Sequence, residues 1–181
     1  EREIGVVLEA TRSNLYQANF PLSWWPRAVR HQCFALNVTD DSWSRARGSA
    51  GDRRKYAFVP EEFGEPSEMR GNLTAYERRH GQENTGLDLP FGCAVRFRMP
   101  PPMLKSKHKF DVPTKEGAFL GRETAPGGVW HGDYVVADLD DLVSGRKHVR
   151  VYIVKELSGP DEITFPLQGV PDVKKSWPEE W

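Results

Sequence analysis

The stretch Phe91-Gly92-Cys93-Ala94-Val95-Arg96-Phe97-Arg98 opens the part of the chain that decides the fold, residues 91–138. Towards its end, Val95 and Phe97 alternate with Arg96 and Arg98, and a period of two is typical of a half-buried β-strand. Prolines at 100–102 end this strand. Three further apolar runs, each bounded by glycine or other turn residues, predict the next strands at 117–121, 129–138 and 148–157.

Four or five short strands with tight connections cannot bury an apolar face while their sheet stays flat. The last run supports the same pattern, because Val149, Val151 and Ile153 alternate with Arg150 and Tyr152. We therefore expect residues 91–157 to form a small antiparallel β-barrel or sandwich.

Apolar side chains at spacings of three and four predict two helices at the start of the chain. The first covers residues 2–18, and its apolar stripe includes Val7, Leu8 and Leu15. The second covers about residues 24–38. Together they predict a helical hairpin that has no strand of its own to pack on.

Residues 39–90 lose this periodicity. An irregular connection of this length is unusual inside one compact domain, so we interpret it as a linker with a short helical turn near 72–79. Repeated prolines after Leu157 predict an extended, weakly ordered tail. The expected α+β organisation has four parts: helices at 1–38, a linker at 39–90, a β-barrel at 91–157 and a tail at 158–181.

Charge is distributed unevenly along the chain. The net charge of −1 argues against indiscriminate binding of polyanions, but residues 91–155 hold eleven Lys and Arg against seven Asp and Glu. Phosphate contacts are therefore expected from this part. The candidate DNA-binding residues are Arg96 and Arg98 on the outward strand face and Lys105, Lys107 and Lys109 in the following loop. The alternative is a solvated loop and an ordinary polar strand face.

Several classes of protein find no support. The sequence contains no phosphate-binding loop, Gly-x-Ser-x-Gly or His-Glu-x-x-His motif. No apolar run approaches the length of a membrane span, and no membrane partner is expected. Cys33 and Cys93 are predicted to be buried free thiols. Because the chain begins without Met, we expect a segment of a longer polypeptide.

Short motifs follow one another along residues 1–138. They are Glu1-Arg2, Leu8-Glu9-Ala10-Thr11-Arg12, Phe20-Pro21-Leu22-Ser23-Trp24-Trp25, Thr74-Ala75-Tyr76-Glu77, Phe91-Gly92-Cys93 and Gly117-Ala118-Phe119-Leu120-Gly121. In order and spacing they resemble the end of the integrase in copia-type long-terminal-repeat retrotransposon polyproteins, which commonly reads E-R, L-L-E-x-A-R, L-P-x-x-F-W, T-P-Y-E, F-G-C and G-I-F-L-G. Where that family continues with Tyr, this chain has Arg122.

The resemblance implies both a fold and a function. Residues 1–38 would be the helical end of an RNase H-like catalytic core, and residues 91–157 would be a small SH3-like barrel that contacts DNA. The implied process is DNA integration in the nucleus. The implied partners are DNA and the remainder of the polyprotein. The resemblance leaves open whether the chain also forms a homo-oligomer.

The same resemblance aligns Glu1 with the last of three carboxylates that hold two divalent ions, usually Mg²⁺, during phosphodiester transfer. The other two carboxylates lie upstream in the family and are not in this chain. Because one glutamate cannot hold two such ions, we expect Glu1 to be catalytic and metal-binding only in an intact parent enzyme. In this chain we expect a solvated carboxylate favoured by the helix dipole, no Mg²⁺ and no strand transfer by the segment alone.

Two other interpretations stay open. The β-barrel is also suited to grip a protein segment as a non-catalytic binding module, and the reading frame is also compatible with decay without a selected role. The salt dependence of binding distinguishes a protein-binding module from a DNA-binding one, because affinity for duplex DNA falls steeply as salt is added.

Overall fold

A computed structural model describes residues 2–39, 74–105, 108–160 and 162–170. The chain divides into two compact units. The first contains residues 1–33 and 86–181, and the second contains residues 34–85.

The two predicted helices at the N-terminus are confirmed as α1, Arg2–Ala18, and α2, Trp25–Thr39, with the 3₁₀ helix η1, Leu22–Trp24, between them. Asn19, the residue directly after α1, has a left-handed φ of 53°. The amide of Phe20 reaches back to the carbonyl of Leu15 at 3.0 Å, and the amide of Asn19 reaches that of Tyr16 at 3.1 Å. This pair of bonds is a Schellman-type C-cap, which sets the angle at which the chain turns towards α2.

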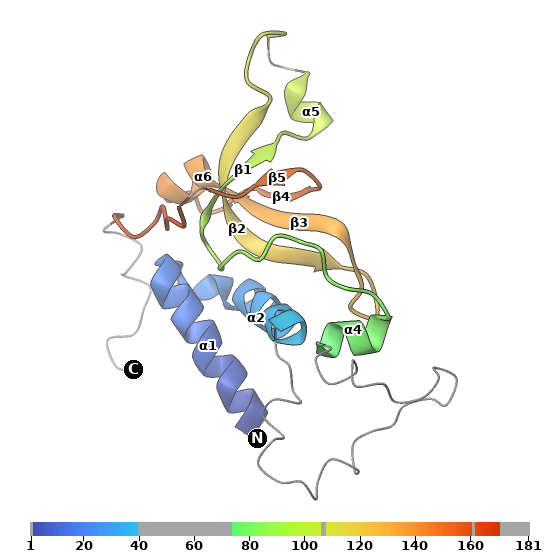
Figure 1. Ribbon diagram of the computed structural model, residues 1–181. Helices are drawn as coiled ribbons and strands as arrows, with labels where there is room; N and C mark the ends of the chain where they lie inside the picture. Colours follow the sequence, from blue (N-terminus) through green and yellow to red (C-terminus); the bar gives the residue numbers. More distant parts are fainter. Residues whose placement is uncertain (1, 40–73, 106–107, 161, 171–181) are drawn as a thin grey trace, which may run out of the picture. The chain divides into compact units, whose positions relative to one another are not determined.

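The strands of the first unit form one five-stranded antiparallel sheet in the order β4-β3-β2-β1-β5 (Figure 1). Two short helices, α5 at Pro101–Leu104 and α6 at Leu139–Val143, interrupt the strands. Each predicted apolar run contributes a strand, with shifted bounds. The strands are β1, Ala94–Arg98; β2, Thr114–Thr124; β3, Trp130–Asp138; β4, Val151–Val154; and β5, Leu157–Ser158.

Strands β4 and β5 are the two edges of the sheet, yet only Lys155 and Glu156 separate them in the chain. Three residue steps span at most about 10 Å, whereas the outer strands of a flat five-stranded sheet lie about 19 Å apart. The sheet must therefore curl until its edges approach each other. Phe97 on β1 and Tyr152 on β4 agree with this curl, because their ring centroids lie 5.3 Å apart although β2 and β3 separate their strands.

Both faces of β2 and β3 are buried. Phe97, Phe119 and Val136 belong to the cluster inside the curl. The residues that alternate with them on β2 and β3 belong to a second cluster, which also contains residues of α1 and α2. Figure 1 shows the ribbons of α1 and α2 together on one side of the sheet. The buried members of this second cluster are Leu15, Ala18, Phe20, Ala28, Phe91, Ala118, Leu120, Val135, Ala137, Leu142 and Leu167.

This packing corrects the expectation of a hairpin without a strand to pack on. The helices and the sheet share one core, because β2 and β3 carry apolar residues on both faces rather than on one. Gly92 shows how closely the parts meet: its φ is 77°, and a Cβ there would lie 2.4 Å from the Cβ of Ala18. Residues 1–33 and the residues from 86 onwards accordingly belong to one compact unit.

The segment before residue 171 also differs from the expected weakly ordered tail. Leu167 is 1% exposed and belongs to the core shared by helices and sheet. Asn19 Nδ2 donates to the carbonyl of Leu167 at 2.6 Å, and Gln168 Nε2 donates to the carbonyl of Gln17 at 2.7 Å. The side chain of Asn19 and the carbonyl of Gln17, at the C-terminal end of α1, therefore hold this segment.

Both cysteines are free, as predicted, but only Cys93 is buried. Burial raises the pKa of the Cys93 thiol to about 12. Cys33 is exposed because the buried face of α2 runs through Ala28, His31 and Phe34 rather than through residue 33.

The second unit is described over residues 34–39 and 74–85. Its helix α4, Ala75–His80, begins with a capping box in which Thr74 Oγ1 accepts from the Glu77 amide at 3.2 Å and Glu77 Oε2 accepts from the Thr74 amide at 2.6 Å. The helix ends at Gly81, with a φ of 66°. The predicted helical turn near 72–79 is thus present, and it contains the Thr-Ala-Tyr-Glu motif. The rest of the predicted linker, residues 40–73, lies outside the described residues.

Candidate nucleic-acid interface

The two predicted arginines lie on the outward face of β1, and each faces a carboxylate. In the register of β1 and β2, Arg96 is opposite Glu116, and its Nη2 lies 3.4 Å from Glu116 Oε1. Arg98 Nη1 lies 3.1 Å from both carboxylate oxygens of Glu156. These pairs are exposed and therefore weak, but they leave this strand face without net positive charge.

Lys105 and Lys109 lie beyond the strand and are exposed. Lys105 follows α5, where its amide donates to the carbonyl of Pro101 at 3.3 Å. Lys109 lies in a turn whose ends are His108 and Asp111. Neither lysine forms an ion pair with another residue that the structure describes, so both ammonium groups are available to a phosphate. Lys107 and Glu1 lie outside the described residues.

A groove of about 330 Å³ lies between α5 and the link that joins β4 to β5. Arg98 and Lys155 line it, together with one acidic residue, Glu156. Apolar residues, among them Leu104 and Ile153, also line it. Since Leu104 directly precedes Lys105, the groove extends the basic loop along the end of the sheet.

A second basic element, the turn between α6 and β4, was missed by the sequence analysis. Asp141 is 1% exposed and binds both arginines of this turn. It accepts from Arg146 Nη1 at 2.8 Å and from Arg150 Nε at 2.6 Å. The hydrogen bond from Arg150 lowers the pKa of Asp141, and the same bond raises the pKa of Arg150. The only signal for it in the sequence is the run Asp-Leu-Asp-Asp followed, after four residues, by Arg-Lys-His-Val-Arg.

Asp138 extends this ionic network across the sheet. It is fully buried and accepts from Lys115 Nζ at 2.7 and 2.8 Å and from Tyr152 Oη at 3.1 Å. Arg150 Nη2 also lies 3.1 Å from Asp138. Burial opposes the charge of Lys115, but the hydrogen bonds to Asp138 and Asp140 outweigh it and raise the pKa of Lys115. Burial, followed by the hydrogen bond to Asp138, raises the pKa of Tyr152. These groups fix β2, β3, α6 and β4 to one another and are not available to a ligand.

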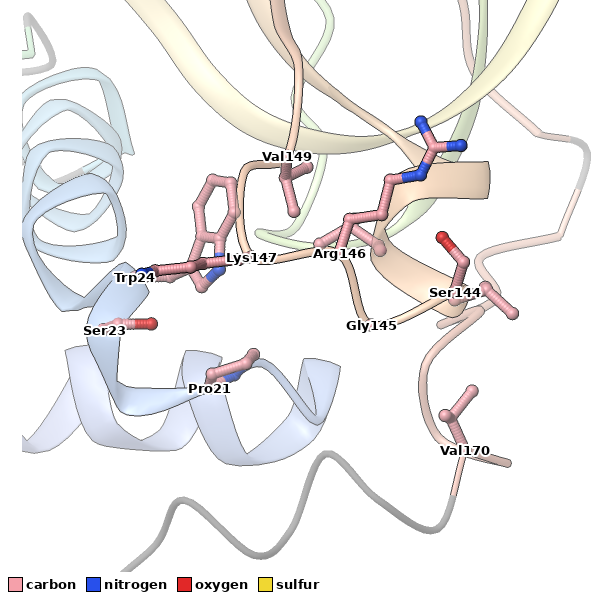
Figure 2. Close-up of a pocket in the computed structure, with 11 residues that line it drawn as sticks. Pro21, Ser23, Trp24, Ser144, Gly145, Arg146, Lys147, Val149 and Val170 are labelled. Carbon is pink, nitrogen blue, oxygen red and sulfur yellow. The ribbon is translucent and has the colours of Figure 1, made fainter.

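A pocket of about 580 Å³ lies between η1 and the α6–β4 turn (Figure 2). Pro21, Ser23 and Trp24 line one side, and the turn with Arg146 and Lys147 lines the other. No carboxylate belongs to its described lining. Because Asp141 binds Arg146, the pocket combines the aromatic side chain of Trp24 with the charge of Lys147, which is suited to an anionic group with an apolar body.

No group of three or more His, Cys, Asp or Glu side chains that could hold a metal ion occurs among the described residues. Glu1, the one carboxylate of this chain that the resemblance assigns to Mg²⁺, lies outside these residues. Within the same ranges, no helix is both long and apolar enough to cross a membrane.

Comparisons of the chain with protein-family models, with curated proteins and with solved structures find no match.

Proposed function

We propose that this chain is the C-terminal part of a copia-type retrotransposon integrase and contacts DNA through its β part without joining strands itself. The observation that carries the DNA contact is the pair of exposed lysines, Lys105 and Lys109, which have no acidic partner within the described ranges. Lys105 directly follows Leu104, which lines the groove together with Lys155. A polyanion gains affinity from such charges independently of its sequence.

The strand order and the curl of the sheet support the proposal of an SH3-like barrel for the β part. The order β4-β3-β2-β1-β5, with β4 and β5 joined by two residues, is compatible with a small, partly closed barrel. The assignment of α1 and α2 to the end of an RNase H-like core rests on the motifs alone.

The expected lack of strand transfer follows from the chemistry of two-metal catalysis. Two Mg²⁺ ions activate the attacking oxygen and stabilise the leaving oxygen, and they require converging carboxylates. In the intact parent enzyme, Glu1 would supply one of these. DNA, the rest of the polyprotein and the nucleus are the proposed partners and location of that parent.

The test is binding of the purified chain to a fluorescent DNA duplex, measured by anisotropy between 50 and 200 mM salt. The variant Lys105→Glu/Lys109→Glu should weaken binding at least about tenfold and reduce the slope of log affinity against log salt by about 2. A control variant, Arg30→Glu/Arg79→Glu, changes the net charge equally at exposed positions outside the loop and outside the pocket beside Trp24.

If both variants lose the same DNA affinity, net charge alone determines the binding and the loop has no special role. If the loop variant keeps its DNA affinity, the interface lies elsewhere. A second control exchanges the charges of one ion pair, Arg96→Glu/Glu116→Arg, and keeps the net charge of the strand face. It should bind DNA as the unmodified chain does.

A protein-binding module is the second candidate, because β4 is an edge strand with apolar side chains on its outer side. Val151 is 37% exposed and Ile153 is 59% exposed. An extended peptide could add to this edge and place a side chain in the groove that Ile153 lines. Such binding should depend little on salt, which distinguishes it from binding to DNA.

A further inference from the structure

The loop between α5 and β2 contains a hydrogen-bonded turn, His108–Asp111. The Asp111 amide donates to the carbonyl of His108 at 3.0 Å, and the His108 amide donates to Asp111 Oδ2 at 3.0 Å. These two bonds close the turn and place Lys109 and Phe110 at its two central positions. A cation and an aromatic ring are therefore presented together at its tip.

Phe110 is 86% exposed, the largest value among the exposed large apolar residues that the structure describes. Single apolar side chains at a surface are common, so exposure alone indicates no function. Phe110 differs from a single exposed apolar residue because a second ring and a cation lie next to it. The ring of His108 lies 5.7 Å from it at an interplanar angle of 34°, and Lys109 precedes it without an ion-pair partner in the described part of the chain.

An aromatic face beside a free ammonium group fits one class of ligand well. Unpaired bases of a nucleic-acid strand offer exposed π-faces, and the phosphates between them carry the charge that a lysine binds. In a duplex the base faces are covered by their neighbours, so the ring gains little there.

Building on the proposed DNA contact, we propose that Phe110 stacks on an unpaired base of DNA while Lys109 binds an adjacent phosphate. The turn then gives the chain a preference for gapped or frayed DNA over a perfect duplex. The charge of Lys105 and Lys109 supplies the sequence-independent part of the affinity, and Phe110 supplies the preference for unpaired bases.

The test compares two labelled DNAs of equal length and sequence, one fully paired and one with a central gap of three nucleotides that leaves three bases unpaired. One of these bases is 2-aminopurine, whose fluorescence falls when it stacks. The unmodified chain should bind the gapped DNA about tenfold more tightly and quench the 2-aminopurine. Phe110→Ala should lose both effects and keep its duplex affinity within about twofold, whereas Phe110→Tyr should retain them.

Val112 provides the matched control, because it lies in the same loop and is 67% exposed but has no aromatic face. Val112→Ala should behave as the unmodified chain does. An equal loss in Phe110→Ala and Val112→Ala would overturn the proposal, since it would indicate a general apolar contact. An equal loss on duplex and gapped DNA in Phe110→Ala would also overturn it, in favour of a wedge between base pairs.

The two proposals fail in distinguishable ways. Salt-dependent duplex binding without any effect of Phe110 overturns the stacking proposal and leaves the proposed DNA contact intact. Absence of DNA binding by the unmodified chain overturns both.

Discussion

His31 is a titratable side chain inside the core between α2 and the sheet. It is 7% exposed, and its ring lies 5.9 Å from that of Phe91 and 5.7 Å from that of Phe119. Burial, and next the charge of Arg122, lowers the pKa of His31 from 6.5 to about 4, although Asp88 acts in the opposite direction. The neutral ring is therefore the form that packs in the folded chain.

This shift predicts a pH dependence of stability. Between pH 6.5 and about 4 the unfolded chain binds a proton at His31 and the folded chain does not, so stability is fully present above pH 6.5 and is lost as the pH falls. We expect the free energy of unfolding in urea to decrease by about 2 kcal/mol at this residue between pH 7.5 and pH 5. His31→Gln should remove this contribution.

The control for His31 is His131→Gln, because His131 is exposed. That variant should keep the pH dependence of the unmodified chain. If the free energy of unfolding depends on pH equally in His31→Gln and in the unmodified chain, the pKa of His31 is not lowered by folding.

At the scale of elements, the carboxylate of Asp138 on β3 connects this strand to β2, β4 and α6. Asp138 and Asp140 both bind Lys115, at 2.7 and 2.9 Å, but the Asp138 side chain is fully buried whereas that of Asp140 is 79% exposed. Breaking a buried ion pair leaves uncompensated charge, while an exposed pair is largely screened by water.

The two carboxylates therefore make a matched pair of variants. Asp138→Asn should reduce the free energy of unfolding by about 3 kcal/mol, and Asp140→Asn by less than about 1 kcal/mol. Chemical denaturation at pH 7 measures both. Equal effects would contradict the ionic network as the connection between β2, β3 and β4.

The elements show where sequence pattern suffices and where it does not. Strong periodicity predicted α1, α2 and the central strands, because their apolar residues recur over many positions. α5 and α6 are too short to show a period. The partners of Arg96 and Lys115 depend on the register of β1, β2 and β3, which pairs residues some twenty positions apart and cannot be inferred from local pattern.

For the whole first unit, the shared core makes the helices part of the stability of the sheet. Leu15, Phe20 and Ala28 belong to the same buried cluster as Leu120 and Val135. We predict that a chain shortened to residues 86–170 will lose cooperative thermal unfolding, because the outer sheet face would be exposed to water. Circular dichroism during heating measures this, with the full chain as control. A cooperative transition in the shortened chain would support an independently folding β part, as the sequence predicted.

The core also explains which part of the candidate site was predictable. The prolines at 100–102 and the basic residues after them predicted an exposed loop. Lys105 and Lys109 are indeed exposed between β1 and β2. The pocket beside Trp24 was not predictable, because η1 and the α6–β4 turn are more than a hundred residues apart in the chain. Only the packing of helices on the sheet brings them together.

The link at Lys155-Glu156 gives the sheet a mechanical property that an open meander lacks. Because the same few residues leave one border and join the other, neither border strand can detach without pulling on its counterpart. Local opening of a sheet normally starts at a free edge strand. Here the link couples the opening of β4 to that of β5, so the two edge strands detach together or not at all. A few glycines inserted into the link would remove this mutual restraint while leaving every side chain of the interior unchanged.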